Sequence, residues 1–287
     1  MKIEDIFDLG KDDFECIEPT LMDQIEDGYT QMAVSMEADM GKLLVDENEE
    51  PISVAFHDEN GWVVSSYLYR PFSIDIINLF ESSSGEIYQE NRDDFACALR
   101  EYYCREIVEE FSDVTEDNRP GRYEMIKSLL TEVLTDKPGK LSGNLKGSYA
   151  LDFCCGSGVA TSVLSDIGFK ALSFDYDASL LSCGIKTKRL NPEFTMCIDG
   201  AEASVFCTPA DIGIGLMLGD ITNFNSEMWE DIVFELLSLT KKSVISTATK
   251  REIELVGEWC RDFGREPEII ENDRDPIYDK WVCYSEE

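Results

Sequence analysis

Three acidic residues stand where a sheet could gather them around one ligand. Asp152, Asp175 and Asp199 each lie at or just beyond the end of a short apolar run. The carboxyl ends of parallel strands open onto a shared crevice, so three such carboxylates would face the same space. Carboxylates accept hydrogen bonds from hydroxyls and amines and neutralise positive charge. We therefore expect a ligand rich in donors and carrying a cation.

The first acid opens a glycine motif, Asp152-x-x-x-Gly156-x-Gly158. Small residues at a strand-to-helix turn let the backbone approach a nucleotide-like ligand. The third position of the dinucleotide fingerprint holds Thr161 instead of Gly or Ala. Three carboxylates would also repel the doubly negative pyrophosphate of NAD or FAD. A cofactor with a sulfonium, an amine and an adenosine fits these residues better.

These segments resemble the motifs of class I S-adenosylmethionine-dependent methyltransferases. The likeness lies in residues 151–158, 174–177 and 199–202, which match the first, second and third motifs of that family. It covers residues 145–287, about half the chain. It implies an α/β fold with a Rossmann-like, mainly parallel seven-stranded sheet whose last strand is antiparallel, and it implies S-adenosyl-L-methionine as the cofactor.

By this resemblance, the glycine loop backs the methionine part of the cofactor, Asp175 holds the ribose, Tyr176 lies against the adenine and Asp199 accepts from the adenine amine. Cys154 stands where the family commonly has glycine, and we interpret it as a backbone and packing contact. The predicted cofactor-binding residues are Asp152, Cys154, Gly156, Gly158, Asp175, Tyr176, Asp199, Gly200, Leu216, Arg122 and Tyr123.

Arg122 and Tyr123 open the helix ahead of the first strand of this region. In many family members that segment folds over the cofactor, and an arginine there can grip the methionine carboxylate bidentately. The alternative is a surface arginine beside a packed tyrosine.

Two residues are candidates for catalysis. Asp220 follows the fourth strand, where the family places its acceptor; it could orient an amine or hydroxyl, or cap the next turn. His57 is the one histidine of the chain, so a histidine base could only be His57, although it could equally be a surface residue beside a turn. Methyl transfer from a sulfonium is an in-line displacement, and positioning and desolvation can supply most of its rate without a base.

The surrounding elements suggest two domains. From residue 148 onward, predicted strands and helices alternate, which favours a parallel sheet covered on both faces. Residues 1–140 read as a helix-rich domain with one hairpin at 51–69, acting as a lid and acceptor-selecting surface. The polar linker 137–143 separates it from the domain at 141–287. Trp62, Tyr67, Tyr69 and Arg70, on and just after the hairpin, line an acceptor pocket or belong to its core.

The amino-acid composition limits the kinds of molecule that the chain can bind. The chain has 59 acidic and 25 basic residues, a net charge of −34, so nucleic acid and acidic membranes are disfavoured. The acid excess serves solubility or a basic protein partner. Ten cysteines without a C-x-x-C pair, and a single histidine, predict reduced thiols and no metal site. No secretory signal or membrane span is evident, which predicts a cytoplasmic protein.

The sequence thus predicts a methyltransferase acting on a small molecule or a protein side chain. The alternative is a non-catalytic S-adenosylmethionine-binding protein with a regulatory or assembly role.

Overall fold

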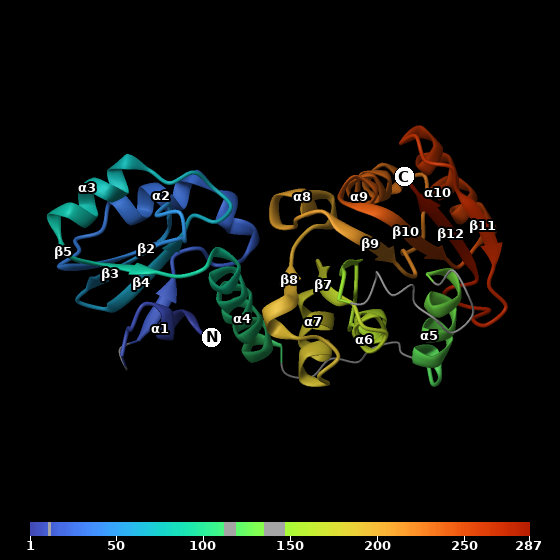
Figure 1. Ribbon diagram of the computed structural model, residues 1–287, viewed down its shortest axis with the longest axis horizontal. Helices are drawn as coiled ribbons and strands as arrows, with labels where there is room; N and C mark the ends of the chain where they lie inside the picture. The colour runs from blue at the N-terminus through green and yellow to red at the C-terminus, as the bar shows by residue number, and fades with distance from the viewer. Residues whose placement is uncertain (11–12, 112–118, 135–146) are drawn as a thin grey trace. The chain divides into compact units, whose positions relative to one another are not determined.

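The computed structural model describes residues 1–10, 13–111, 119–134 and 147–287 (Figure 1). The chain forms two compact units, Met1–Glu106 and Ile107–Glu287, so the division falls inside helix α4 (Arg92–Glu110). The predicted linker at 137–143 lies outside the described residues.

The first unit is built on a five-stranded sheet in the order β1-β4-β3-β2-β5, which corrects the expectation of a helix-rich domain with one hairpin. The predicted hairpin is present as the antiparallel pair β3–β4, which pairs His57 with Trp62. The elements are α1 (Ile3–Ile6), β1 (Phe14–Cys16), the 3-10 turn η1 (Met22–Ile25), α2 (Asp27–Val34), β2 (Met40–Val45), β3 (Pro51–Asp58), β4 (Gly61–Ser66), α3 (Ile74–Ser82), β5 (Ser84–Gln89) and α4.

The strands that sequence reasoning missed have physical reasons to be inconspicuous. β5 is an edge strand whose residues are almost all exposed, so it lacks the apolar alternation that signals a strand. β1 has only three residues. Of the four residues at or beside the hairpin that could have lined a pocket, Trp62 and Tyr67 are buried in this unit, and Arg70 pairs with the buried carboxylate of Glu18.

The second unit contains a seven-stranded sheet in the order β11-β12-β10-β9-β6-β7-β8. The pairs among β6, β7, β8, β9 and β10 are parallel, and β12 is antiparallel to both of its neighbours. This is the predicted Rossmann-like sheet with an antiparallel last strand. The strands are β6 (Tyr149–Phe153), β7 (Lys170–Asp175), β8 (Thr195–Cys197), β9 (Ala210–Gly215), β10 (Thr240–Thr247), β11 (Glu268–Glu271) and β12 (Trp281–Glu286).

Helices cover both faces of this sheet (Figure 1). They are α5 (Arg122–Val133), α6 (Val159–Asp166), α7 (Ala178–Lys186), α8 (Ala203–Phe206), α9 (Ser226–Leu239) and α10 (Lys250–Asp262), with 3-10 turns η2 (Pro192–Phe194) and η3 (Gly200–Glu202).

Strand β9 shows how the two faces are built. Ile212 and Ile214 pack into one core with residues of α5 and α6. The alternate positions are Gly213 and Gly215, where an added Cβ would lie 3.2 and 3.4 Å from Leu236 of α9. Since successive strand residues point to opposite faces, the two isoleucines hold one helical layer and the two glycines let the other approach closely.

None of the helices in the described parts of the chain combines the length and the apolar character that a membrane crossing requires.

Candidate cofactor-binding site

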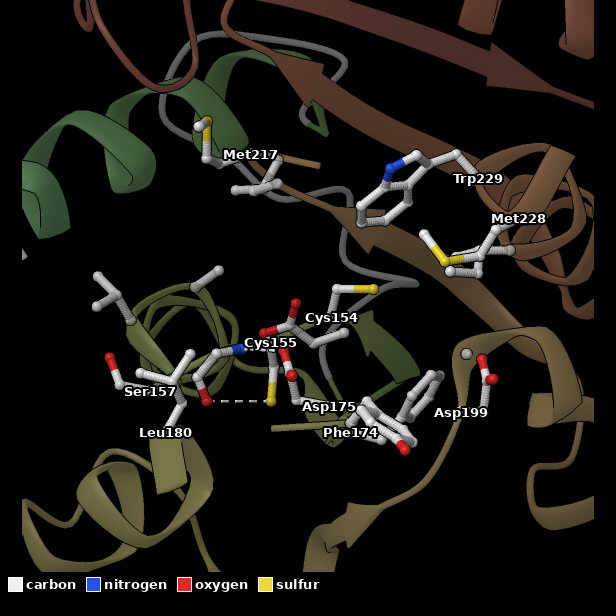
Figure 2. A pocket seen from close by; sticks show the side chains of 18 of the residues that line it. Cys154, Cys155, Ser157, Phe174, Asp175, Leu180, Asp199, Met217, Met228 and Trp229 are labelled. Atoms are coloured by element: carbon white, nitrogen blue, oxygen red, sulfur yellow. Dashed lines mark hydrogen bonds between the residues drawn. The ribbon is translucent and has the colours of Figure 1, made fainter. Parts of the chain in front are cut away.

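A cavity of about 730 Å³ opens at the carboxyl ends of the parallel strands of the second unit (Figure 2). β6 pairs with β7 on one side and with β9 on the other, so the strand order reverses here, as it does at ligand sites of open α/β sheets. Its volume suits a small-molecule ligand. The wall is formed by Arg122, Asp152, Cys154, Cys155, Gly156, Ser157, Val159, Ala160, Phe174, Asp175, Tyr176, Leu180, Asp199, Gly200, Leu216, Met217, Met228, Trp229 and Ile232.

The glycine loop between β6 and α6 turns through left-handed backbone conformations. Cys154, Gly156 and Gly158 have φ of 53°, 53° and 77°. At Gly156 an added Cβ would meet only a leucine side chain at 3.9 Å, so its smallness leaves room in the cavity. At Gly158 an added Cβ would lie 2.3 Å from Leu190, and Gly158 is not part of the cavity wall. The structure thus gives Gly158 a packing role, whereas the motif suggested a ligand contact.

Asp175 links this loop to the second strand. Its Oδ2 accepts a hydrogen bond from the Gly156 N–H at 2.8 Å, and its Oδ1 accepts from the Asp177 N–H at 2.8 Å. Burial raises the pKa of this carboxyl above its ordinary range. Each oxygen retains a lone pair for a ligand hydroxyl, because an ionised carboxylate offers about four acceptor sites. The neighbouring Tyr176 also lines the cavity, with 78% of its side chain exposed.

Asp152 is the most buried acid of the wall, at 1% exposure. Burial is the main cause that raises its pKa to about 7, and the negative charge of Asp175 adds to it. The Thr161 hydroxyl donates to Asp152 Oδ2 at 2.5 Å, which favours the ionised form. Thr161, the departure from the dinucleotide fingerprint, therefore stabilises the acid that opens the motif.

Asp199 lies on the same wall at the end of the third strand. Its Oδ1 accepts from the Ala201 N–H at 2.9 Å and caps η3. Gly200 follows in the wall, and a Cβ there would lie 3.3 Å from Ile232 of α9. The structure thus brings the acids at 152, 175 and 199 to one cavity.

Arg122, at the start of α5, is the one arginine or lysine among the wall residues that the structure describes. Its Nη2 lies 3.5 Å from Asp279 Oδ2, and its guanidinium lies 4.9 Å from the centre of the Tyr278 ring. Its Nε is buried and has no hydrogen-bond partner in the described structure. A buried donor of this kind is costly unless a ligand accepts from it, and a carboxylate is the acceptor that a guanidinium prefers.

Three other predicted site residues are not part of this wall. The Tyr123 hydroxyl donates to the Asp166 carboxylate instead. Asp220 is exposed, and its main-chain carbonyl accepts from Asn225 Nδ2 at 2.9 Å. His57 belongs to the first unit, where its Nδ1 lies 3.0 Å from Asp39 Oδ1.

Part of the wall was not anticipated. Met217, Met228 and Trp229 lie on one side of the cavity, with Asp175 and Leu180 on the other (Figure 2). Met217 has a φ of 55°, and its N–H donates to the Ser246 hydroxyl at 2.7 Å. The indole Nε1 of Trp229 is buried without a partner in the described structure. The sequence predicts a helix at about 228–239, but this pattern does not reveal that Met228 and Trp229 line a cavity.

The charge of the wall favours a cationic ligand. Three carboxylates stand against one guanidinium, and the wall also contains the thiols of Cys154 and Cys155, whose pKa values burial raises well above the ordinary range. These thiols stay protonated and do not act as nucleophiles at neutral pH. All ten cysteines lie in described segments, and no disulfide bond joins any of them. Across those same segments no group of three or more potential metal-ligating side chains is clustered.

The strand order and the antiparallel last strand define the second unit as a class I methyltransferase fold. No protein-family model matches the chain, and no curated protein is significantly similar to it. Solved structures with a similar fold include magnesium protoporphyrin IX methyltransferase from Synechocystis PCC 6803 with bound SAM, at 18% identity and a TM-score of 0.47, covering 64% of this chain and 89% of that one.

Two others are equally distant. Precorrin-6y C5,15-methyltransferase from Geobacter metallireducens has 11% identity and a TM-score of 0.44, covering 62% of this chain and 96% of that one. Ribosomal protein L11 methylase from Lactobacillus delbrueckii subsp. bulgaricus has 12% identity and a TM-score of 0.43, covering 59% and 80%.

Proposed function

We propose that the chain binds S-adenosyl-L-methionine in this cavity and transfers its methyl group to an acceptor. The observation that carries the proposal is the set of groups around one cavity: three carboxylates and one arginine whose Nε has no partner among the described residues. The ligand must bring hydroxyls, an amine and a positive charge to the acids and a carboxylate to the arginine. S-adenosylmethionine has all of these groups.

Each residue would take the group that its chemistry suits. Asp175 would accept from the ribose hydroxyls, and Asp199 would accept from the adenine amine. Arg122 would donate to the carboxylate of the methionine part. Asp152, at the base of the glycine loop, would offset the positive charge of the amine and sulfonium. The bound cofactor supplies a methyl group already activated by the sulfonium.

The rest of the wall bears on the acceptor. Met217, Met228 and Trp229 make this part of the wall apolar, and an acceptor that loses its water against them would react more readily at a sulfonium carbon. Among the described wall residues no histidine or lysine is available as a base. The protein would therefore act mainly by positioning an acceptor that reacts without help in removing a proton. A small molecule and a protein side chain both remain candidates, and the net charge of −34 disfavours nucleic acid and an acidic membrane.

Isothermal titration calorimetry with S-adenosylmethionine and S-adenosylhomocysteine tests the cofactor assignment. We expect binding of both, and Asp175→Ala should abolish it, because two hydrogen bonds to a charged group are lost at about 1.5–3 kcal/mol each. Asp273→Ala is the matched control, since that side chain is 94% exposed and is not part of the cavity wall. Absence of binding at high micromolar concentration would refute the proposal.

The second candidate is a protein that binds the cofactor without turnover. The intact acids favour binding in both cases, so only transfer distinguishes them. Cell extract incubated with cofactor labelled in the methyl group should place label in a small-molecule or a protein fraction if the chain is an enzyme. The Asp175→Ala variant should transfer no label.

A further inference from the structure

A buried acid that is not part of the cavity wall contacts Arg122, which is part of it. Asp279 precedes β12, and its side chain is 2% exposed. Its Oδ2 lies 3.5 Å from Arg122 Nη2, and its Oδ1 accepts from the Ser246 hydroxyl at 2.5 Å. That hydroxyl in turn accepts from the Met217 N–H at 2.7 Å. One carboxylate thus connects the arginine on one wall with the left-handed turn at Met217 on another.

The segment that carries Asp279 is held in place by its own contacts. Asn272 Nδ2 donates to the Asp279 carbonyl at 2.8 Å, and the Asn272 N–H donates to the Lys280 carbonyl at 2.8 Å. Asp275 Oδ1 accepts from the Ile277 N–H at 2.9 Å. These bonds join the two ends of the β11–β12 connection, so the position of Asp279 is set by the sheet.

The same connection grips α5 at a second place. Arg274 Nε donates to the Ser128 hydroxyl at 3.0 Å, one and a half turns beyond Arg122 along the helix. Because α5 begins directly after Gly121, which has a φ of 83°, its first turn has no side-chain cap of its own. The β11–β12 connection therefore supplies the anchor for the helix end that presents Arg122.

We propose that Asp279 is a positioning residue for the cofactor carboxylate: it holds the Arg122 guanidinium against the wall and, through Ser246, fixes the Met217 turn. This inference rests on the proposed function, since it concerns the same cavity. It goes further because it assigns a role to a residue outside the wall. It also connects Arg122 with Met217 through Asp279 and Ser246.

Charge explains why the arginine needs such a partner. Arg122 also interacts electrostatically with Asp152, a buried acid of the cavity wall. A guanidinium with only Asp152 as a buried counter-charge would move toward it, across the space that the methionine part of the cofactor needs. Asp279, which is not part of the cavity wall, attracts Arg122 as well, and the Tyr278 ring adds a cation–π contact of 4.9 Å. The guanidinium is thus shared between two acids and is not bound to Asp152 alone.

Two probes separate positioning from a general structural role. S-adenosylhomocysteine carries the amino-acid carboxylate, and 5′-methylthioadenosine keeps the adenosine and thioether but lacks that carboxylate. We expect Asp279→Asn to bind S-adenosylhomocysteine at least about tenfold more weakly, the effect of one charge-assisted hydrogen bond, and to bind 5′-methylthioadenosine as the wild type does. Asp273→Asn, the same change at an exposed position of the same connection, should alter neither affinity.

A double-mutant cycle adds a readout that a structural role would not move. In an Arg122→Gln background, Asp279→Asn should cause no further loss of S-adenosylhomocysteine affinity, because the group that Asp279 positions is already gone. Equal weakening for both probes, additive losses in the cycle, or tighter S-adenosylhomocysteine binding by Asp279→Asn would each overturn the inference. Tighter binding would mean that Asp279 only competes with the ligand for Arg122.

If Asp279→Asn does not fold, Ser246→Ala decides. It keeps every charge and removes the hydroxyl donor of Asp279, and we expect a smaller loss that is again confined to S-adenosylhomocysteine. Unchanged affinity in that variant overturns the inference. Failure of the proposed function looks different: the wild type itself would bind neither probe.

Discussion

The Asp152→Asn variant should gain stability relative to the wild type as the pH rises from 5 to 8. We expect this for the unliganded protein, although the substitution removes a group from the proposed site. The wild-type carboxyl has a pKa of about 7 in the folded chain, raised mainly by burial from an ordinary value of 3.8. Between these two values the folded state binds a proton that the unfolded state has released. Stability therefore falls as pH rises from about 4 to about 7 and changes little above that.

The size of the effect follows from this difference. About three pKa units at 1.36 kcal/mol each correspond to roughly 4 kcal/mol lost between low pH and pH 8. Because the carboxyl of the unfolded chain is already ionised at pH 5, part of this decrease in unfolding free energy has occurred by that pH. A further decrease of roughly 2.5 kcal/mol is expected between pH 5 and pH 8. An amide at this position does not titrate. Any cost of fitting it beside Thr161 is the same at both pH values.

Urea unfolding of both proteins at pH 5, 6, 7 and 8 measures this difference. The chain has four tryptophans, of which Trp62 lies in the first unit and Trp229, Trp259 and Trp281 in the second. A Trp62→Phe background lets fluorescence report on the unit that contains Asp152, which matters because two units need not unfold together.

The control is Asp273→Asn, which removes the same charge from an exposed side chain. Its unfolding free energy should follow the wild type across the pH range. A difference between Asp152→Asn and wild type that does not grow with pH would refute the reasoning, since it would mean that Asp152 is ionised in the fold at no cost.

The remaining predictions concern packing and the same acid. Thr161→Val should act in the opposite direction to Asp152→Asn, because it removes a donor to the ionised Asp152, and should destabilise by about 1–3 kcal/mol, more at pH 8 than at pH 5, in the same urea series. Gly158→Ala should destabilise by about 2–4 kcal/mol in thermal or urea unfolding, from the left-handed backbone and the collision with Leu190; normal stability would show that the loop relaxes freely. Gly213→Ala should cost about 1–3 kcal/mol because its Cβ would lie 2.7 Å from the Thr240 side chain of β10 and 3.2 Å from Leu236 of α9, and a crystal structure in which neither side chain moves would contradict this.

The sequence allowed the sheet of the second unit to be predicted, together with the acids that line its cavity, because the positions of these acids follow from topology. Acids at 152, 175 and 199 end successive strands, and parallel strands bring such ends together whatever the rest of the chain does. Topology did not decide between the two roles predicted for Arg122, since a helix before the first strand has no fixed place in that pattern. The structure shows its side chain on the cavity wall, with an Nε that has no partner in the described parts of the chain.

Other features depend on contacts between residues far apart in the chain. Gly158 looks like a ligand contact in the motif, but the position of Leu190 makes it a packing residue. Thr161 looks like a departure from a fingerprint until its hydroxyl is seen at 2.5 Å from Asp152. In the first unit, β1 and β5 carried little signal, since β1 has three residues and the edge strand β5 is polar and exposed; β2 was missed although Leu43 and Leu44 in it are apolar and buried.

The raised pKa of Asp152 depends in part on the position of Arg122, because Arg122 is the positive charge of the wall that acts on it. The carboxyl of Asp152, with a pKa of about 7, is costly to ionise in the empty cavity. A ligand with a positive charge offsets this cost, so it should bind more tightly than a neutral ligand of the same shape. The same variant, Asp152→Asn, should therefore weaken S-adenosylmethionine more than S-adenosylhomocysteine, which has no sulfonium charge. Arg122 offsets part of the charge of Asp152 from within the protein, but it also pairs with Asp279, and burial still holds the pKa of Asp152 at about 7. The positive charge that would balance an ionised Asp152 therefore has to come from the ligand.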